Sequence, residues 1–277
     1  MGAGTAGVAE VAAEDAGAGD AGAGTAGVGA AGVKGELRAL LSTSLAVRMT
    51  GAIDAERAAR WAAGVRGARA DWVSDFDGSQ FSLGRAWYTH LEQDRAADYF
   101  ANASASDATV QRACPGLQEA MRELAARVVG APVVARPGWC GPGVHVFPAG
   151  GEVATRGGEI HFDTEGLTPA HVAERAPALT LVLMLQPPSA GGGLKVWDEL
   201  YDGEVAKGFE AADGADDDED DDESAERPPT TCAYEAGTLL VIDSYRLHQI
   251  QAFAGAVDRI SATIHAAFVG GVWETWF

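Results

Sequence analysis

Three side chains in the second half of the chain have the types and the spacing of metal ligands. His161 and Asp163 are two residues apart in a segment, Glu159 to Thr164, whose pattern predicts a strand. Because side chains alternate between the faces of a strand, both project from the same face. His248, shortly after the predicted strand Thr238 to Asp243, is the candidate third ligand. Two imidazoles and one carboxylate hold a metal ion from one side and leave its other coordination positions open.

A second pair of residues has the character of an anion site. Arg259 comes eleven residues after His248, and Ser261 follows it. Both lie on one face of a further predicted strand, Arg259 to Phe268. A guanidinium presents a planar fork of donors that matches a carboxylate, and a neighbouring hydroxyl adds another donor. The pair is therefore predicted to hold a terminal carboxylate.

The ordered set, His-x-Asp, a distal His and Arg-x-Ser, resembles the 2-oxoglutarate/Fe(II)-dependent dioxygenases. The resemblance covers roughly Val144 to Phe268. It implies that His161, Asp163 and His248 bind Fe(II), and that Arg259 and Ser261 hold the distal carboxylate of 2-oxoglutarate. No catalytic residue is expected beyond the metal ligands.

The resemblance also implies a reaction. It is the 2-oxoglutarate- and O₂-dependent oxidation of a small molecule, with release of succinate and CO₂ and with ascorbate as a candidate reductant. Related halogenases replace the carboxylate ligand by a small residue so that chloride can bind iron. Asp163 is present here, so hydroxylation or another oxidation is expected, and desaturation, cyclisation and demethylation stay open. The expected substrate is amino-acid-like or a natural product. The alternatives are a protein or peptide hydroxylase and a non-catalytic jelly-roll binding module.

Taken one at a time, these residues have simpler explanations. A lone His161 is more often a surface or hydrogen-bonded core histidine, and Asp163 alone fits a turn. Arg259 alone fits an ion pair with Asp243 or Asp258. Only the order and spacing of the whole set favour a metal site. The histidines left outside it are His90, His145, His171 and His265, and the candidate substrate walls, for which core packing is favoured, are Trp87, Tyr88 and Trp197.

Composition limits the partners of the chain. The formal net charge of -20 over 277 residues opposes binding to a nucleic-acid backbone. Much of that charge is local, since residues 213–223 carry nine carboxylates and no basic residue. The longest apolar run, Ala178 to Leu185, is too short to cross a bilayer, so no membrane partner is expected. Three widely spaced cysteines argue against a disulfide framework and for a cytoplasmic protein. Oligomeric state stays open.

The chain divides into three parts by its pattern. Residues 1–34 are a Gly- and Ala-rich, low-complexity tail that is predicted to be disordered. Residues 35–131 are predicted to form a helical N-terminal layer, with a helix after Asp54, a hairpin within 71–88 and a helix over 116–129. Residues 132–277 contain short strands separated by Gly and Pro, with an acidic loop inserted at about 208–228. Short strands separated in this way suggest a sandwich or a jelly roll. The resemblance implies a fold that is mainly β with α, a double-stranded β-helix (jelly roll) with an N-terminal helical layer packed against it.

Overall fold

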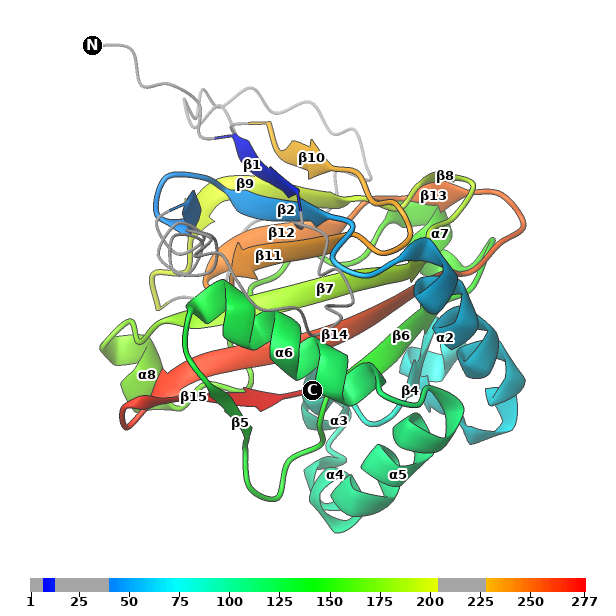
Figure 1. Ribbon diagram of the computed structural model, residues 1–277, viewed down its shortest axis with the longest axis horizontal. Coiled ribbons are helices and arrows are strands. Elements are labelled where there is room, and N and C mark those ends of the chain that lie inside the picture. The colour runs from blue at the N-terminus through cyan, green and yellow to red at the C-terminus, as the bar shows by residue number, and fades with distance from the viewer. Residues whose placement is uncertain (1–6, 13–39, 204–227) are drawn as a thin grey trace, which may run out of the picture.

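A large mixed sheet forms the centre of the protein in the computed structural model, which describes residues 7–12, 40–203 and 228–277. It has ten strands, eight of them on one continuous path, while β15 pairs with β14 and β5 pairs with β15 (Figure 1). The path runs through β1 (Val8–Ala12), β2 (Ala46–Thr50), β11 (Leu239–Asp243), β7 (Ala178–Gln186), β14 (Arg259–Val269), β6 (Gly143–Phe147), β4 (Gln80–Leu83) and β3 (Val73–Asp75), with β15 (Val272–Trp276) and β5 (Val133–Ala135) off it.

A smaller sheet packs against one end of the large one. It consists of β10 (Thr230–Cys232), β9 (Leu194–Leu200) and β12 (Arg246–Ile250), and a short ladder joins β8 (Ala190–Gly191) to β13 (Phe253–Ala254). Leu194 and Val196 of the small sheet form a buried cluster with Leu240 and Ile242 of β11. The two sheets therefore enclose a common interior, as in a jelly roll.

Helices cover the other face of the large sheet. Helices α2 (Ala55–Gly67) and α6 (Leu117–Val129) bury their apolar side chains against it, and α6 crosses in front of β14 in Figure 1. The alternate residues Leu181, Leu183 and Leu185 of β7 belong to this helix-side core. Because β7 is covered on both faces, its sequence is apolar except for Thr180 and Gln186. The remaining helices are α3 (Trp87–Glu92), α4 (Ala96–Ala101), α5 (Ala103–Ala113), α7 (Glu152–Arg156), α8 (Pro169–Ala173) and the 3₁₀ turns Arg69–Asp71 and Phe76–Gly78.

Local signals explain where the main helices begin and end. The Asp54 side chain accepts a hydrogen bond from the backbone N of Arg57 at 2.7 Å and so caps α2. Helix α6 ends at Gly130, whose φ of 70° lies in the left-handed region that glycine adopts without strain. In the described residues, no helix combines the length and the apolar character needed to cross a membrane.

The first strand differs from the prediction of a disordered tail. Val8–Ala12 pairs in parallel with β2, and Glu10 forms an ion pair with Arg48 at 3.1 Å. The edge of β2 offers free backbone groups, and Val8 and Val11 gain partly buried positions against the core. Residues 1–6 and 13–39 lie outside the described residues, as does the predicted acidic loop up to residue 227.

The predicted N-terminal layer is not purely helical. Strand β2 pairs with β11, and β4 pairs with β6, so the segment before residue 132 supplies strands to the same sheet as the segment after it. These strands complete the sheet because they cover edges that β11 and β6 would otherwise expose.

Candidate metal centre

Strand β12 and the segment before α8 hold the two histidines side by side. The backbone N of His161 donates to the O of His248, and the N of His248 donates to the O of His161, both at 3.0 Å. The predicted strand over 159–164 is therefore only an isolated bridge, whereas His248 lies within a strand and not after one. A register shift between Arg246 and His248 interrupts the ladder along β12.

A glycine allows the segment to approach β12. Gly157 has a φ of 89°, and an added Cβ would lie 2.8 Å from the carbonyl oxygen of Ile250. Both facts exclude larger residues there. The N of Gly158 donates to the same carbonyl at 2.9 Å, and the N of Asp163 donates to the O of Ser244 at 2.9 Å. These bonds fix the ligand-bearing segment at both ends.

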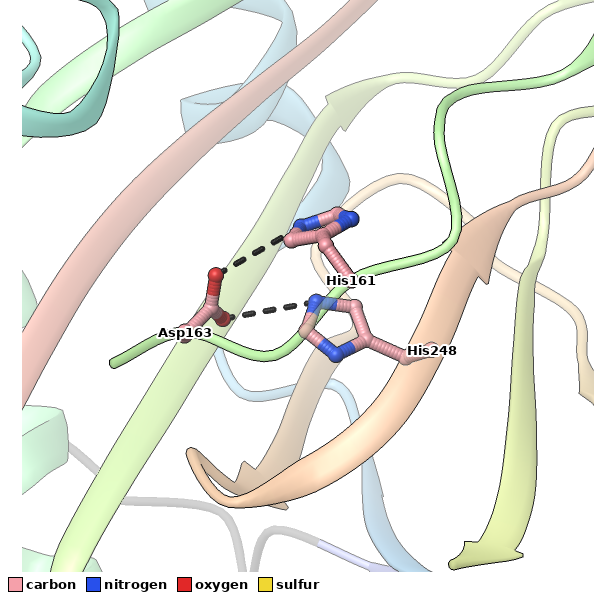
Figure 2. A group of neighbouring side chains, drawn as sticks. All are labelled: His161, Asp163 and His248. Atoms are coloured by element: carbon pink, nitrogen blue, oxygen red, sulfur yellow. Dashed lines mark ion pairs between the residues drawn. The ribbon is translucent and has the colours of Figure 1, made fainter. Parts of the chain in front are cut away.

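The three predicted ligands converge, as Figure 2 shows. The Nε2 atom of His161 lies 3.5 Å from Oδ1 of Asp163, and the Nε2 atom of His248 lies 3.4 Å from Oδ2. One ligand atom from each residue lies within 4.8 Å of the others. A single metal ion can therefore contact all three.

Hydrogen bonds on the far side of each ring select the tautomer. The Nδ1 atom of His161 lies 2.9 Å from the carbonyl of Glu159, and that of His248 lies 2.9 Å from the carbonyl of Arg246. A carbonyl only accepts, so each Nδ1 carries a hydrogen, and Nε2 is the nitrogen that faces Asp163 and would bind a metal once the ring is neutral. Metal-binding histidines are oriented in this way.

The carboxylate is oriented by a hydroxyl. The Thr180 Oγ1 donates to Oδ2 of Asp163 at 2.6 Å. The hydroxyl of Thr180 has only one hydrogen, and the bond to Asp163 takes it. Toward its other two neighbours Thr180 therefore acts as an acceptor, from the hydroxyl of Ser244 at 3.0 Å and from Nδ1 of His265 at 3.1 Å.

The electrostatics of the triad are those of a site that holds positive charge. Burial lowers the pKa of His161, but the hydrogen bond and the charge of Asp163 have the larger effect. Together they raise the pKa of His161 to about 9. Burial likewise opposes ionisation of Asp163, yet His248 and His161 hold its pKa well below the usual range. A bound divalent ion would replace the proton between them.

Arg259 and Ser261 lie on the interior face of β14. Their neighbours Ile260 and Ala262 point to the helix-side core, which sends Arg259 and Ser261 into the space between the sheets. Arg259 is 1% exposed, donates from Nε to the carbonyl of Gly192 at 2.9 Å, and donates from Nη1 to the hydroxyl of Ser261 at 3.0 Å.

The expected alternative partners of Arg259 are engaged elsewhere. Asp243 accepts from the backbone N of Tyr245, and Asp258 accepts from the N of Ala149. Arg259 makes no ion pair with any residue that the structure describes. Burial lowers its pKa. A buried guanidinium without a counter-ion is costly, which fits a site for an anionic ligand.

Two further polar side chains lie near Arg259, of which Tyr234 was not considered from the sequence and His145 was interpreted there as a histidine outside the metal site. The hydroxyl of Tyr234 is buried without a partner in the described structure, and the Arg259 guanidinium lies 5.4 Å from its ring centre. Nδ1 of His145, a residue paired with Ser261 across the sheet, is also buried and unpartnered there. No spacing in the sequence marks Tyr234, because only the fold brings it to Arg259.

A hollow opens beside Asp163. Of the aromatic residues considered as substrate walls, Trp87 and Tyr88 line it, whereas Trp197 packs in a core cluster with Phe162 and Leu247. Its full lining is Trp87, Tyr88, Asp163, Glu165, Gly166, His265 and Trp276.

The other two histidines have structural tasks. Nδ1 of His90 lies 2.8 Å from the carbonyl of Ala86. His171 and Thr168 form the capping box at the start of α8. Neither contributes to the triad.

No protein-family model matches this sequence, and no curated protein matches it. Solved structures are similar in shape. An N-substituted L-amino acid dioxygenase from Burkholderia ambifaria AMMD is 16% identical, with a TM-score of 0.50 over 88% of this chain and 91% of that one. A 2OG-Fe(II) oxygenase family oxidoreductase from Burkholderia pseudomallei is 13% identical, with a TM-score of 0.43 over 84% and 89%. A Pseudomonas putida prolyl-4-hydroxylase is 15% identical, with a TM-score of 0.45 over 83% and 97%. The predicted fold class, a mainly β jelly roll with helices, is confirmed.

Proposed function

We propose that the protein is a 2-oxoglutarate- and Fe(II)-dependent oxygenase that oxidises a small molecule, most directly by hydroxylation. The observation that carries the proposal is the convergence of His161, Asp163 and His248, with both Nε2 atoms turned toward the carboxylate. Fe(II) with 2-oxoglutarate and O₂ supplies the oxidising chemistry when bound, with succinate and CO₂ as products.

The residues of the triad have separable tasks. The two neutral imidazoles donate lone pairs, and Asp163 contributes the negative charge that partly neutralises a divalent ion. Thr180 holds Oδ2 of Asp163 and so directs the carboxylate. The three ligands lie on one side of the ion and leave positions for a chelating cosubstrate.

The cosubstrate is expected to extend from the triad to Arg259. The guanidinium already holds the hydroxyl of Ser261, and its other N–H groups have no acceptor among the described residues. A terminal carboxylate would accept from Arg259, Ser261 and the unpartnered hydroxyl of Tyr234. The free donors of Arg259, Ser261 and Tyr234 would then be satisfied.

The substrate class is proposed to be amino-acid-like or a natural product. The similarity to an N-substituted L-amino acid dioxygenase is consistent with this class. The orphaned Arg259 and the complete triad disfavour a binding module without activity. For the peptide-hydroxylase alternative, poly-lysine peptides should compete with a small substrate, and deletion of the acidic segment 208–228 should abolish that competition.

The deciding experiment is anaerobic addition of Fe(II) and then 2-oxoglutarate. We expect a weak charge-transfer band in the visible range, because the cosubstrate chelates the metal. Asp163→Ala should lack the band, whereas Glu174→Gln, an exposed change on the surface, should keep it. A wild-type protein that binds neither Fe(II) nor 2-oxoglutarate would leave only the binding-module alternative.

A further inference from the structure

The hollow beside Asp163 has aromatic walls and a narrow interior. Trp87, Tyr88 and Trp276 line it, and it encloses about 260 Å³, partly open to solvent. Within it there is room for about one water molecule. A small head group fits there, while the bulk of a ligand would stay outside.

The charged side chains that line the hollow are carboxylates, Asp163 and Glu165. Glu165 is fixed there because its backbone carbonyl accepts from Nε1 of Trp87 at 2.8 Å. Within the described part of the chain, Glu165 makes no ion pair. Burial, together with the charge of Asp163, raises its pKa to about 7, so its carboxylate is ionised above that pH. No lysine or arginine from that part lines the hollow.

One arginine, Arg136, contacts the aromatic wall through Trp276. The Arg136 guanidinium lies 3.9 Å from the ring centre of Trp276. It donates from Nη1 to the carbonyl of Gly166 at 2.7 Å and from Nε to Glu274 at 3.1 Å. Arg136 is therefore paired with Glu274 and does not neutralise Glu165.

The remaining polar group, His265, presents an acceptor. Its Nδ1 carries the hydrogen, because the Thr180 hydroxyl has already donated its proton to Asp163. The opposite nitrogen, Nε2, therefore has a free lone pair. The ring stacks on Trp276 with 5.8 Å between ring centres, which holds its orientation.

The charge of the loaded site points the same way. This step rests on the proposed function, in which Fe(II) and the 2-oxoglutarate dianion cancel, as do the charges of Asp163 and Arg259. The carboxylate of Glu165, which lines the hollow, then remains as the net negative charge of the site. A carboxylate, a lone pair and aromatic rings are the groups that bind a small cation.

We propose that this hollow is a substrate subsite, the ammonium pocket (Trp87, Tyr88, Glu165, His265 and Trp276), which binds a primary ammonium group. The substrate is then a small amine, held by its nitrogen with its carbon skeleton next to the metal. Glu165 supplies the counter-charge and His265 accepts a hydrogen bond.

The test compares a charged probe with its neutral analogue. The protein is loaded with Mn(II) and 2-oxoglutarate, and the paramagnetic relaxation of the methylene protons of n-butylamine and of 1-butanol is titrated. We expect n-butylamine to bind about tenfold more tightly than 1-butanol, because only the ammonium can pair with Glu165. Glu165→Gln should remove most of this preference without changing the binding of 1-butanol.

Two further variants control for folding and for general charge. Glu165→Asp keeps the carboxylate and should keep most of the preference, while Glu174→Gln, an exposed change just after α8, should alter nothing. Equal binding of the two probes, or an unchanged preference in Glu165→Gln, would overturn the ammonium pocket alone. Failure of the wild type to bind Mn(II) and 2-oxoglutarate would overturn the proposed function as well.

Discussion

At the scale of single residues, Thr180 connects the proposed metal ligand to the fold. It contacts Asp163, Ser244 and His265 through one oxygen atom. Thr180→Val keeps the shape but leaves Oδ2 of Asp163 free to turn. We expect the affinity for Co(II), measured by competition with a chelator, to fall roughly 10–100-fold. Losses of this size are typical when a residue that hydrogen-bonds to a metal ligand is replaced.

The matched control is Thr180→Ser, which restores the hydroxyl. It should recover most of the affinity, since its Oγ can make the same bond to Asp163. An unchanged Co(II) affinity in Thr180→Val would mean that the metal orients Asp163 without help.

Arg259 gives a prediction about the cosubstrate. Arg259→Lys keeps the charge but loses the planar fork that holds Ser261 and the ligand together. The loss of charge-assisted hydrogen bonds should cost about 1.5–3 kcal/mol. The apparent KM for 2-oxoglutarate should therefore rise roughly tenfold to hundredfold. Co(II) affinity should stay nearly unchanged, because Arg259 is not a predicted ligand.

Tyr234→Phe should act in the same direction but less strongly, since it removes one neutral donor. If Arg259→Lys left the KM for 2-oxoglutarate unaltered, the assignment of the cosubstrate site would be wrong. The metal site would survive that result.

The sequence analysis named the proposed metal ligands but not the residues that orient them. His161, Asp163 and His248 could be named because their types are rare together and their order is informative, and the three side chains converge in the structure. Thr180 and Tyr234 have common side chains, and nothing in their spacing indicates which neighbour they meet. Their roles depend on strands that are distant in sequence and become neighbours only in the sheet.

At the scale of elements, β1 makes a testable contribution to stability. Val8 and Val11 are half-buried at the edge of the large sheet. Replacing both by serine should cost about 1–2 kcal/mol of the free energy of unfolding. For a chain of this size, we expect Tm to fall by roughly 3–6 °C in a thermal unfolding scan.

Glu10→Gln is the control for this strand. Its ion pair with Arg48 is partly exposed, and such pairs contribute little, so Tm should change by about 1 °C at most. An equal Tm for the double serine variant and the wild type would show that β1 does not stabilise the sheet in solution.

Elements were predicted well where one periodicity dominates. The helix after Asp54, the helix over 116–129 and the long strand over 259–268 are observed nearly as expected. The strand over 159–164 was wrong because glycines and a broken register leave only one bridge. Strand β12 was missed because Arg246, His248 and Gln249 make it look polar, although the interior accepts them.

At the scale of the whole molecule, His145 links stability to pH. Burial, together with the positive charges of His265 and Arg259, lowers its pKa to about 3. The unfolded chain takes up a proton near pH 6.5, while the folded chain does not until about pH 3. Stability contributed by neutral His145 is thus present above pH 6.5 and is lost as the pH falls through this window. The loss is roughly 1 kcal/mol per pH unit.

His145→Leu should flatten this dependence. Between about pH 6.5 and pH 4, the wild type should lose more of its free energy of unfolding in urea than the variant does. Other acids titrate in both proteins and cancel in the comparison. Identical slopes would mean that His145 is protonated in the folded state.

The strand pattern alone left a sandwich or a jelly roll open, and the resemblance to the 2-oxoglutarate/Fe(II)-dependent dioxygenases favoured the jelly roll. The division at residue 132 was less informative, since β2 and β4 join the sheet from the N-terminal side. Whether a segment joins a sheet as an edge strand depends on which neighbouring strand has unpaired backbone groups. That is decided only once the sheet is assembled and cannot be read from the segment itself.

The mutual backbone bonds of His161 and His248 have one more consequence. The segment from Gly158 to Asp163 meets the sheet at only a few amides, so it can open locally without unfolding the rest. A metal bound by both imidazoles would cross-link this segment, through His161, to strand β12, through His248. Hydrogen exchange at these amides should then be slower with the metal bound than without it. The bound ion would in this way control how often this segment opens.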